Sequence, residues 1–174
     1  MAKLIFSDID GTLINTDLKV TPKTRDAIRR QIIKGNVFVP VSARMPKAIM
    51  TAAGQITNGC PMIAYNGALV LDEMGKPLNS QFMTAKTAAE ICQYVEDKNN
   101  GSAWNVYSGY NWYCSKNKSL LVEDEEKIVA VKAISVSIDQ IKKLKGVHKV
   151  LLMGKPKVLD QMKADLTPKY PNLY

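Results

Sequence analysis

Two aspartates separated by one residue, Asp8 and Asp10, stand near the N-terminus within the segment Asp8–Thr12. They follow the apolar run Leu4–Phe6, which predicts a fully buried strand of a parallel sheet. Carboxylates at the end of such a strand are costly to desolvate unless they are paired or bind a cation. Side chains two apart on a strand share a face, so we expect both acids to reach one metal ion. Gly11 is expected to let the chain turn away. A loop of acidic turn residues is the alternative.

Three segments carry a family resemblance. Asp8–Leu13 resembles the nucleophile motif of the haloacid dehalogenase (HAD) superfamily of phosphohydrolases. Val37–Arg44 is similar to the second motif of that superfamily, a buried strand ending in Ser or Thr, although Ala43 stands where Gly is most frequent. Ile63–Ala68 is similar to the next strand and turn of the Cof-type subfamily, which carries a large cap domain of type C2. The order and spacing of the segments agree with that subfamily.

The resemblance implies a Mg²⁺-dependent phosphatase acting on small phosphomonoesters such as sugar phosphates. Asp8 is then the nucleophile, which forms an aspartyl-phosphate intermediate. Asp10 is the general acid and base, which protonates the leaving alcohol and later activates water. The Asp8 carboxylate and the Asp10 backbone carbonyl hold Mg²⁺, which offsets the repulsion between carboxylate and phosphate. The alternatives are a phosphotransferase such as a phosphomutase, and a non-catalytic HAD-like fragment.

The resemblance also implies substrate-binding roles for four further residues. Ser42 is expected to hydrogen-bond a phosphate oxygen, and a buried hydroxyl satisfied by backbone is its structural alternative. Arg44, Asn66 and Gly67 are expected near the entrance of the active site, where a guanidinium suits a phosphate oxygen. Arg44 has a structural alternative as a solvated residue at the start of a helix. Asn66 and Gly67 have one as turn residues, because both tolerate positive φ.

Two motifs that HAD enzymes carry further along the chain are missing. The first is a Lys that neutralises the nucleophile and phosphate, and the second is a Gly-Asp motif that completes the Mg²⁺ site. No Gly-Asp pair occurs among the 174 residues, and no Lys precedes further core strands. We therefore expect an N-terminal part of a longer enzyme, inactive alone. Its incomplete sheet would leave an open edge that invites self-association.

Composition favours a soluble, cytoplasmic protein that binds neither membranes nor nucleic acid. Hydrophobic residues make up 46% of the chain, but no stretch approaches the ~20 apolar residues of a membrane span. We expect no signal peptide, because Met1-Ala2-Lys3 leads straight into the first predicted strand. The three cysteines lack metal or redox spacing, which favours reduced, buried thiols. The net charge of +8 is shared equally by residues 1–83 and 84–174, and a mild positive field favours a small phosphorylated substrate.

Residues 1–83 are expected to form the N-terminal part of a Rossmann-like, parallel-sheet HAD core in an α/β protein. Strand, helix, strand, helix and strand over residues 3–65 predict right-handed crossovers. Thr21-Pro22 starts the first helix and Gly35 ends it, and Pro46 opens a second helix towards Gln55. Pro40 falls inside a strand, where proline is normally confined to edges, starts or bulges. A β-hairpin of Ala68–Asp72 and Pro77–Met83 follows.

Residues 84–174 are expected to form an incomplete α+β cap domain. The predicted elements are an amphipathic helix at Ala85–Lys98, an aromatic hairpin of Trp104–Ser108 and Asn111–Ser115, a strand at Ile134–Ile138, a helix near Asp139–Lys145, a strand at Val147–Met153 and a helix at Lys157–Leu166. We interpret the aromatic residues of the hairpin as core packing, with a substrate-facing surface as the alternative. The resemblance implies that the cap closes over the active site and selects the substrate.

Overall fold

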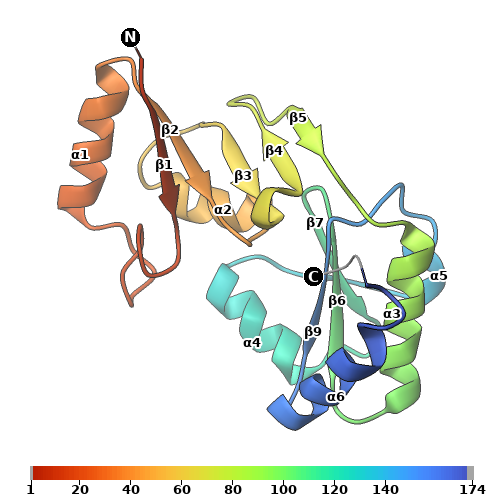
Figure 1. Cartoon of the computed structure of the whole chain (residues 1–174). Helices are drawn as coiled ribbons and strands as arrows, with labels where there is room; N and C mark the ends of the chain where they lie inside the picture. The colour runs from red at the N-terminus through yellow and green to blue at the C-terminus, as the bar shows by residue number, and fades with distance from the viewer. Residues whose placement is uncertain (1, 172–174) are drawn as a thin grey trace. The chain divides into compact units, whose positions relative to one another are not determined.

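The computed structural model describes residues 2–171. Its elements are, in chain order, β1 (Leu4–Asp8), α1 (Pro22–Ile33), β2 (Val37–Val41), α2 (Pro46–Ala53), β3 (Met62–Ala64), the short helix η1 (Tyr65–Gly67), β4 (Leu69–Leu71), β5 (Pro77–Ser80), α3 (Ala85–Lys98), β6 (Ala103–Ser108), β7 (Asn111–Ser115), α4 (Leu120–Val129), β8 (Ile134–Val136), α5 (Ile138–Ile141), β9 (Lys149–Met153) and α6 (Pro156–Leu166). They form two compact units (Figure 1), Met1–Phe82 with Val129–Val131, and Met83–Ile128 with Lys132–Tyr174. Each unit has a sheet with helices packed on it, so the predicted α/β class is confirmed.

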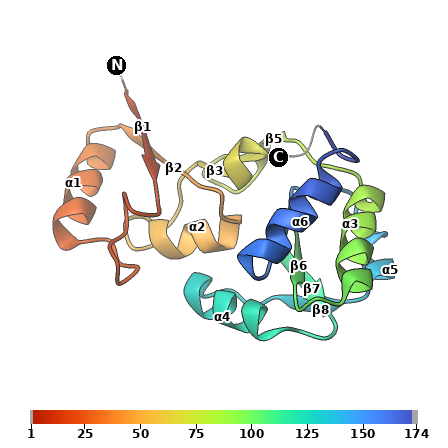
Figure 2. The same ribbon diagram turned by 60° about the horizontal axis from the view of Figure 1, so that its bottom comes forward.

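The first unit contains a five-stranded sheet in the order β1-β2-β3-β4-β5. β1, β2 and β3 are parallel, whereas β4 and β5 are antiparallel to their neighbours. α1 and α2 lie on the same face of this sheet (Figures 1 and 2), as two right-handed crossovers in one direction require. The predicted parallel order and the hairpin are confirmed, although both hairpin strands are shorter than predicted.

The predicted signals fix both ends of α1. The Thr21 hydroxyl accepts a hydrogen bond from the Thr24 N–H at 3.2 Å, and Pro22 is the first helical residue. Gly35 adopts a φ of 81°, and its N–H donates to the Ile32 carbonyl, which ends the helix.

β1 forms where the apolar run predicts it, but the prediction that it is fully buried is wrong. β1 is the edge strand of its sheet, and Leu4 and Phe6 are 62% and 57% exposed. The Val37 N–H of β2 donates to the Lys3 carbonyl. Because backbone groups alternate in direction along a strand, those of Leu4, Phe6 and Asp8 point away from β2. The apolar run determines that a strand forms, whereas the place of that strand in the sheet determines its burial.

Pro40 lies within β2, an inner strand, at a position where its missing N–H costs little. The Val37 N–H points towards β1, whereas the Ser42 N–H donates to the Ile63 carbonyl of β3. Position 40 therefore faces the β3 side. β3 spans only Met62–Ala64 and is aligned with β2 at a single pair of residues. Pro40 consequently stands beside the region where pairing with β3 has not begun.

The second unit contains a four-stranded sheet in the order β8-β7-β6-β9. Helices α3, α5 and α6 pack with Trp104 and Val106 of β6 in one hydrophobic core. Figure 2 shows α4 on the opposite side of this sheet from α3 and α6. The bounds of α3 are those predicted, and β6 and β7 form the predicted hairpin around Gly109.

Several later elements differ from their predicted bounds. β8 ends at Val136, α5 occupies Ile138–Ile141, β9 begins at Lys149 and α6 begins at Pro156. α4 was not predicted from the sequence. Its central run Glu123–Lys127 is entirely charged and separates the apolar residues at its two ends, and its buried side chains are Val122 and Glu126.

Buried side chains agree with two predictions made from composition. Trp104, Tyr107 and Trp112 of the hairpin are buried, so these aromatic residues serve core packing as predicted. All three cysteines are buried and free. Burial raises the pKa of the Cys60 thiol to about 11, which keeps it protonated.

Candidate active site

The two aspartates of the first motif lie at the carboxyl end of β1. Asp8 is the last residue of the strand, and Asp10 lies beyond it. Because Asp10 lies outside the strand, the alternation of side chains along β1 does not determine where its side chain points, contrary to the prediction. The N–H groups of Thr12 and Leu13 donate to the Ile9 carbonyl at 3.3 and 3.0 Å, which forms a tight turn. Gly11 adopts a φ of 72° in this turn, so its predicted role in redirecting the chain is confirmed.

Ser42 lies at the carboxyl end of the neighbouring strand. Val41, the last residue of β2, is aligned with Asp8, and Ser42 follows it. The Ser42 side chain is buried, and its Oγ accepts a hydrogen bond from the Arg44 N–H at 3.1 Å. A hydroxyl accepts through its lone pairs and donates through its single hydrogen. The backbone N–H of Arg44 thus occupies one of the two acceptor sites of the Ser42 hydroxyl.

Arg44 pairs with Asp10 through a two-pronged contact. The Arg44 Nε donates to Asp10 Oδ2 at 2.9 Å, and Nη2 donates to Oδ1 at 2.6 Å. The Arg44 side chain is 15% exposed and that of Asp10 is 56% exposed. The alternative of a solvated Arg44 is therefore excluded. No local pattern predicts this pair, because its members are 34 residues apart.

Asn66 and Gly67 lie beside the same strand ends. The Asn66 N–H donates to the Ser42 carbonyl, and the Tyr65 N–H donates to the Arg44 carbonyl, each at 3.2 Å. Asn66 and Gly67 have φ values of 54° and 99°, so they serve as turn residues that tolerate positive φ. These backbone bonds fasten the turn after β3 to the loop after β2.

The family resemblance implies that the Asp8 carboxylate and the Asp10 backbone carbonyl would be the donor atoms for a divalent cation. Both are hard oxygen donors, which suit Mg²⁺; this ion binds through one or two carboxylates and keeps several waters. Among residues 2–171, no three His, Cys, Asp or Glu side chains gather closely enough to hold a metal ion. A Mg²⁺ ion at this site would therefore take most of its ligands from water and phosphate oxygens.

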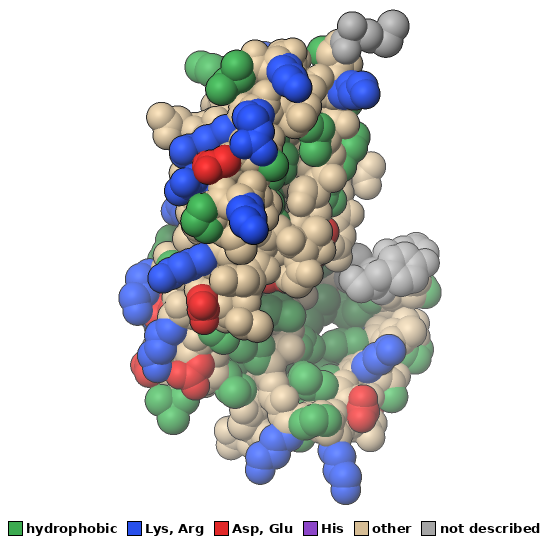
Figure 3. Space-filling model, turned by 90° about the vertical axis from the view of Figure 1, so that its left-hand side faces the viewer, with side chains coloured by type: hydrophobic (Ala, Val, Ile, Leu, Met, Phe, Trp, Pro, Cys, Tyr) green, Lys and Arg blue, Asp and Glu red, His purple; other side chains and the backbone are tan. Residues whose placement is uncertain are grey.

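The surface carries charge of both signs. Lys and Arg predominate over Asp and Glu on the face drawn in Figure 3 and are spread across it, in line with the net charge of +8. Within residues 2–171, none of the helices combines the length and the apolar character that crossing a bilayer requires.

Comparison with known proteins shows which family and which relatives this chain is similar to. The family model of haloacid dehalogenase-like hydrolases matches residues 5–174. A Haemophilus influenzae protein, whose name assigns it provisionally to the phosphatases, is 29% identical over 178 residues. That match covers 99% of this chain and 64% of the relative, so the chain spans less than two thirds of the relative's length.

Two solved structures share the fold. A Thermotoga maritima protein superposes with a TM-score of 0.83 at 24% identity, over 99% of this chain and 64% of that one. A Plasmodium vivax protein, described provisionally as a HAD/COF-like hydrolase, superposes with a TM-score of 0.81 at 23% identity, over 98% and 63%. The fold expected from the Cof-type resemblance is thereby confirmed. With the family model matching nearly every residue, the chain belongs to the haloacid dehalogenase-like hydrolases.

Proposed function

We propose that the chain carries the nucleophile and phosphate-binding part of a Mg²⁺-dependent phosphatase that acts on small phosphomonoesters such as sugar phosphates. The observation that carries this proposal is the meeting of Asp8, Asp10 and Ser42 at the carboxyl ends of two adjacent parallel strands. Ligands of open α/β sheets bind at this edge. The family match and the relative with a phosphatase name support the same reaction class.

In the proposed reaction, a carboxylate oxygen of Asp8 attacks phosphorus, and the bond from phosphorus to the alcohol oxygen breaks. Asp10 gives its proton to the departing alcohol, so the alcohol leaves neutral. Asp10 then takes a proton from water as the water oxygen attacks phosphorus. This second attack breaks the bond to Asp8 and releases inorganic phosphate.

Side chains around the acids orient the phosphate in this proposal. Ser42 donates its hydroxyl hydrogen to a non-bridging phosphate oxygen. Arg44 positions Asp10 through its two-pronged contact, and its remaining guanidinium N–H groups serve a phosphate or sugar oxygen. Asn66 and Gly67 form the neighbouring wall of the entrance.

Mg²⁺ bound by the Asp8 carboxylate and the Asp10 carbonyl would neutralise the charge that otherwise keeps a carboxylate from a phosphate. With only these two protein oxygens, the 174-residue chain by itself is expected to bind Mg²⁺ weakly and to turn over slowly. We place the reaction in the cytoplasm, and the three free, buried cysteines support a reducing compartment.

Asp8→Asn tests the proposal with two measurements. Beryllofluoride mimics a phosphoryl group on aspartate, and we expect ¹⁹F NMR to show Mg²⁺-dependent binding by the wild type and none by Asp8→Asn. In the longer enzyme of which the chain is proposed to be a part, hydrolysis of p-nitrophenyl phosphate is expected to fall by several orders of magnitude. Asp17→Asn, in the following loop, is the matched control and should behave like the wild type. Equal beryllofluoride binding by Asp8→Asn would refute the covalent mechanism.

A further inference from the structure

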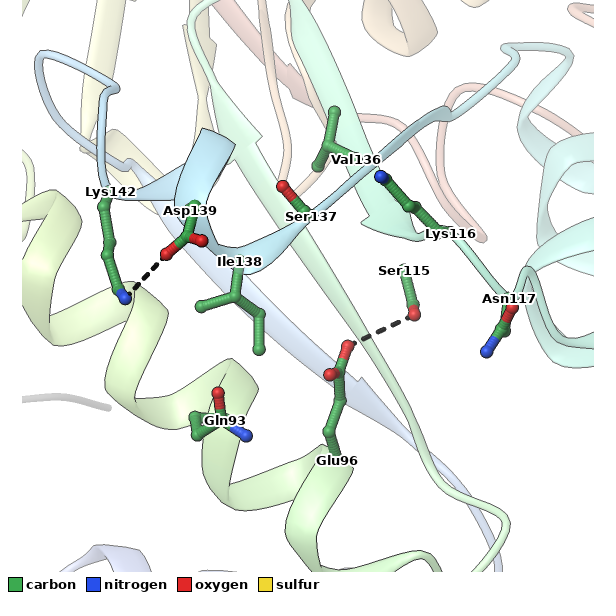
Figure 4. Close-up of a pocket in the computed structure, with 10 residues that line it drawn as sticks. All are labelled: Gln93, Glu96, Ser115, Lys116, Asn117, Val136, Ser137, Ile138, Asp139 and Lys142. Atoms are coloured by element: carbon green, nitrogen blue, oxygen red, sulfur yellow. Dashed lines mark hydrogen bonds and ion pairs between the residues drawn. The ribbon is translucent and has the colours of Figure 1, made fainter.

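A hollow of about 270 Å³ opens in the second unit between α3, the end of β7, β8 and α5 (Figure 4). It lies on the side of the sheet that α3 covers, because Ser115 in its wall bonds to Glu96 of α3. Asp8, Asp10 and Ser42 all belong to the other unit. The residues that line the hollow are therefore different from those of the candidate active site.

Glu96 of α3 is fixed in one wall of this hollow. The buried Trp104 donates from Nε1 to Glu96 Oε1 at 3.0 Å, and the Ser115 hydroxyl donates to the same oxygen at 3.2 Å. In Figure 4 the Glu96 side chain rises from α3 towards Ser115 and into the hollow. A carboxylate accepts hydrogen bonds at both oxygens, so Oε2 offers an acceptor to a ligand.

Gln93 adds a second acceptor to the same wall. It lies three residues before Glu96, a spacing that places the two side chains on one face of α3. The Gln93 Nε2 donates to Asp97 Oδ1 at 2.8 Å, so the amide nitrogen is engaged while the amide oxygen can accept. The α3 wall thus presents hydrogen-bond acceptors and one negative charge.

The opposite wall presents donors and a positive charge. Lys116 and Asn117 follow β7, and in Figure 4 the Lys116 side chain extends towards Val136 and Ser137. An ammonium group can only donate, and it carries a full charge. Ile138 and Val136 supply an apolar surface between the two walls. Asp139 and Lys142 also line the hollow, and their charges offset each other in an ion pair of 2.8 Å. The charge of the hollow is therefore polarised from Lys116 at one side to Glu96 at the other.

We propose that this hollow binds a small organic molecule that carries an anionic group at one end and hydrogen-bond donors at the other. The anionic group would face Lys116 and Asn117, and the donors would face Glu96 and Gln93. Two ligand sources share this chemistry, a sugar phosphate with hydroxyl donors and an α-amino acid with an ammonium donor. Inorganic phosphate alone gains nothing from the α3 wall, where the Glu96 charge repels it. A hollow of this volume suits molecules smaller than the drug-sized ligands of larger pockets.

The two tryptophans provide an internal reporter for this binding. The Trp104 indole N–H is bonded to Glu96, whereas the Trp112 indole N–H donates to Asn105 Oδ1 at 2.8 Å. A ¹⁵N-labelled chain titrated with glucose 6-phosphate or with L-glutamine should show a saturable shift of the Trp104 indole resonance, with Trp112 unmoved. Glu96→Gln assigns the Trp104 signal and removes the charge. Glu96→Gln should weaken the binding of L-glutamine more than that of glucose 6-phosphate, because the ammonium group of glutamine depends on the charge of Glu96.

Matched variants decide the outcome. Lys116→Gln should weaken binding about fivefold, a typical effect of losing one exposed ion pair, while Lys86→Gln at the start of α3 should not. A response to only one of the two compounds identifies the donor type and supports the site. The proposal is overturned if neither compound moves the Trp104 resonance, or if Lys116→Gln leaves the shift unchanged. The proposal is also overturned if inorganic phosphate alone or glucose alone shifts the Trp104 resonance as much as glucose 6-phosphate or L-glutamine does.

Discussion

The guanidinium of Arg44 holds both carboxylate oxygens of Asp10, with Nε and Nη2 at 2.9 and 2.6 Å from Oδ2 and Oδ1. Planar, two-pronged contacts of this kind fix orientation as well as adding attraction. The pair fastens the turn after β1 to the loop after β2, so it joins the two segments that supply the candidate site. In the proposed reaction Asp10 must give a proton to the leaving alcohol.

Arg44→Lys keeps the positive charge but removes the two-pronged geometry. Because Asp10 would then be less well positioned, we expect kcat/KM of the longer enzyme for p-nitrophenyl phosphate to fall about tenfold, the effect of losing about 1.4 kcal/mol of transition-state stabilisation. Arg30→Lys on the exposed surface of α1 is the control. If both variants show the same kcat/KM, Arg44 does not position Asp10.

Glu126→Gln should destabilise the second unit. The Glu126 side chain is 2% exposed and is bonded to Lys118 at 2.7 Å, to Lys132 at 2.9 Å and to the Ala133 N–H at 2.8 Å. Losing charge-assisted hydrogen bonds at a buried position costs about 1–3 kcal/mol of unfolding free energy. Asp124→Asn removes an exposed partner of Lys127 in the same helix and should cost under about 1 kcal/mol. Urea unfolding followed by tryptophan fluorescence measures the unfolding free energy of both variants. Equal losses of unfolding free energy in the two variants would contradict a structural role for Glu126.

The same carboxylate should make stability depend on pH. Burial opposes the ionisation of Glu126, but its bonds from Lys118, Lys132 and Ala133 outweigh burial and lower its pKa from 4.5 to about 2. The unfolded chain therefore binds a proton more readily than the folded chain between these values. The contribution of Glu126 is present above about pH 4.5 and is lost as the pH falls towards 2. The drop in urea midpoint from pH 6 to pH 3 should be smaller for Glu126→Gln than for the wild type.

We expect the chain to self-associate through the free edge of β1. Unpaired backbone groups beside the exposed Leu4 and Phe6 form a template for pairing with another strand. Phe6→Lys places a charge on this edge and should shift light scattering towards the monomer. Phe82→Lys is the matched control, because Phe82 is also 57% exposed but lies after β5. A monomeric wild type, or equal effects of the two variants, would argue against the β1 edge.

Local sequence signals account for much of the fold. Thr21 and Pro22 marked the start of α1, and the apolar spacing along α3 gave its bounds. α4 was not predicted, because one of its two buried residues is Glu126, whose burial no pattern of apolar residues indicates. Its burial depends on two lysines outside the helix, so it becomes visible only in three dimensions.

The candidate site shows the same division. The motif around Asp8 and the strand before Ser42 indicated which strand ends matter, and both residues lie at adjacent ends. The contact between Arg44 and Asp10 was beyond sequence reasoning, because it depends on how two loops turn after their strands. The exposure of Phe6 was likewise missed, since strand order and not composition made β1 an edge.

Strand order also bears on how the chain emerges from the ribosome. In the sheet of the first unit, the strands lie side by side in the order in which they are synthesised. Each new strand therefore pairs with one that is already present. β6 instead pairs with β7 and with β9, aligning Ala103 with Met153. At about 5–20 residues per second, the second sheet waits about 3–10 s for its last strand. During this interval β6 of the aromatic hairpin has no partner on the side where β9 will pair. This is the stage of synthesis at which the chain most needs protection by a chaperone.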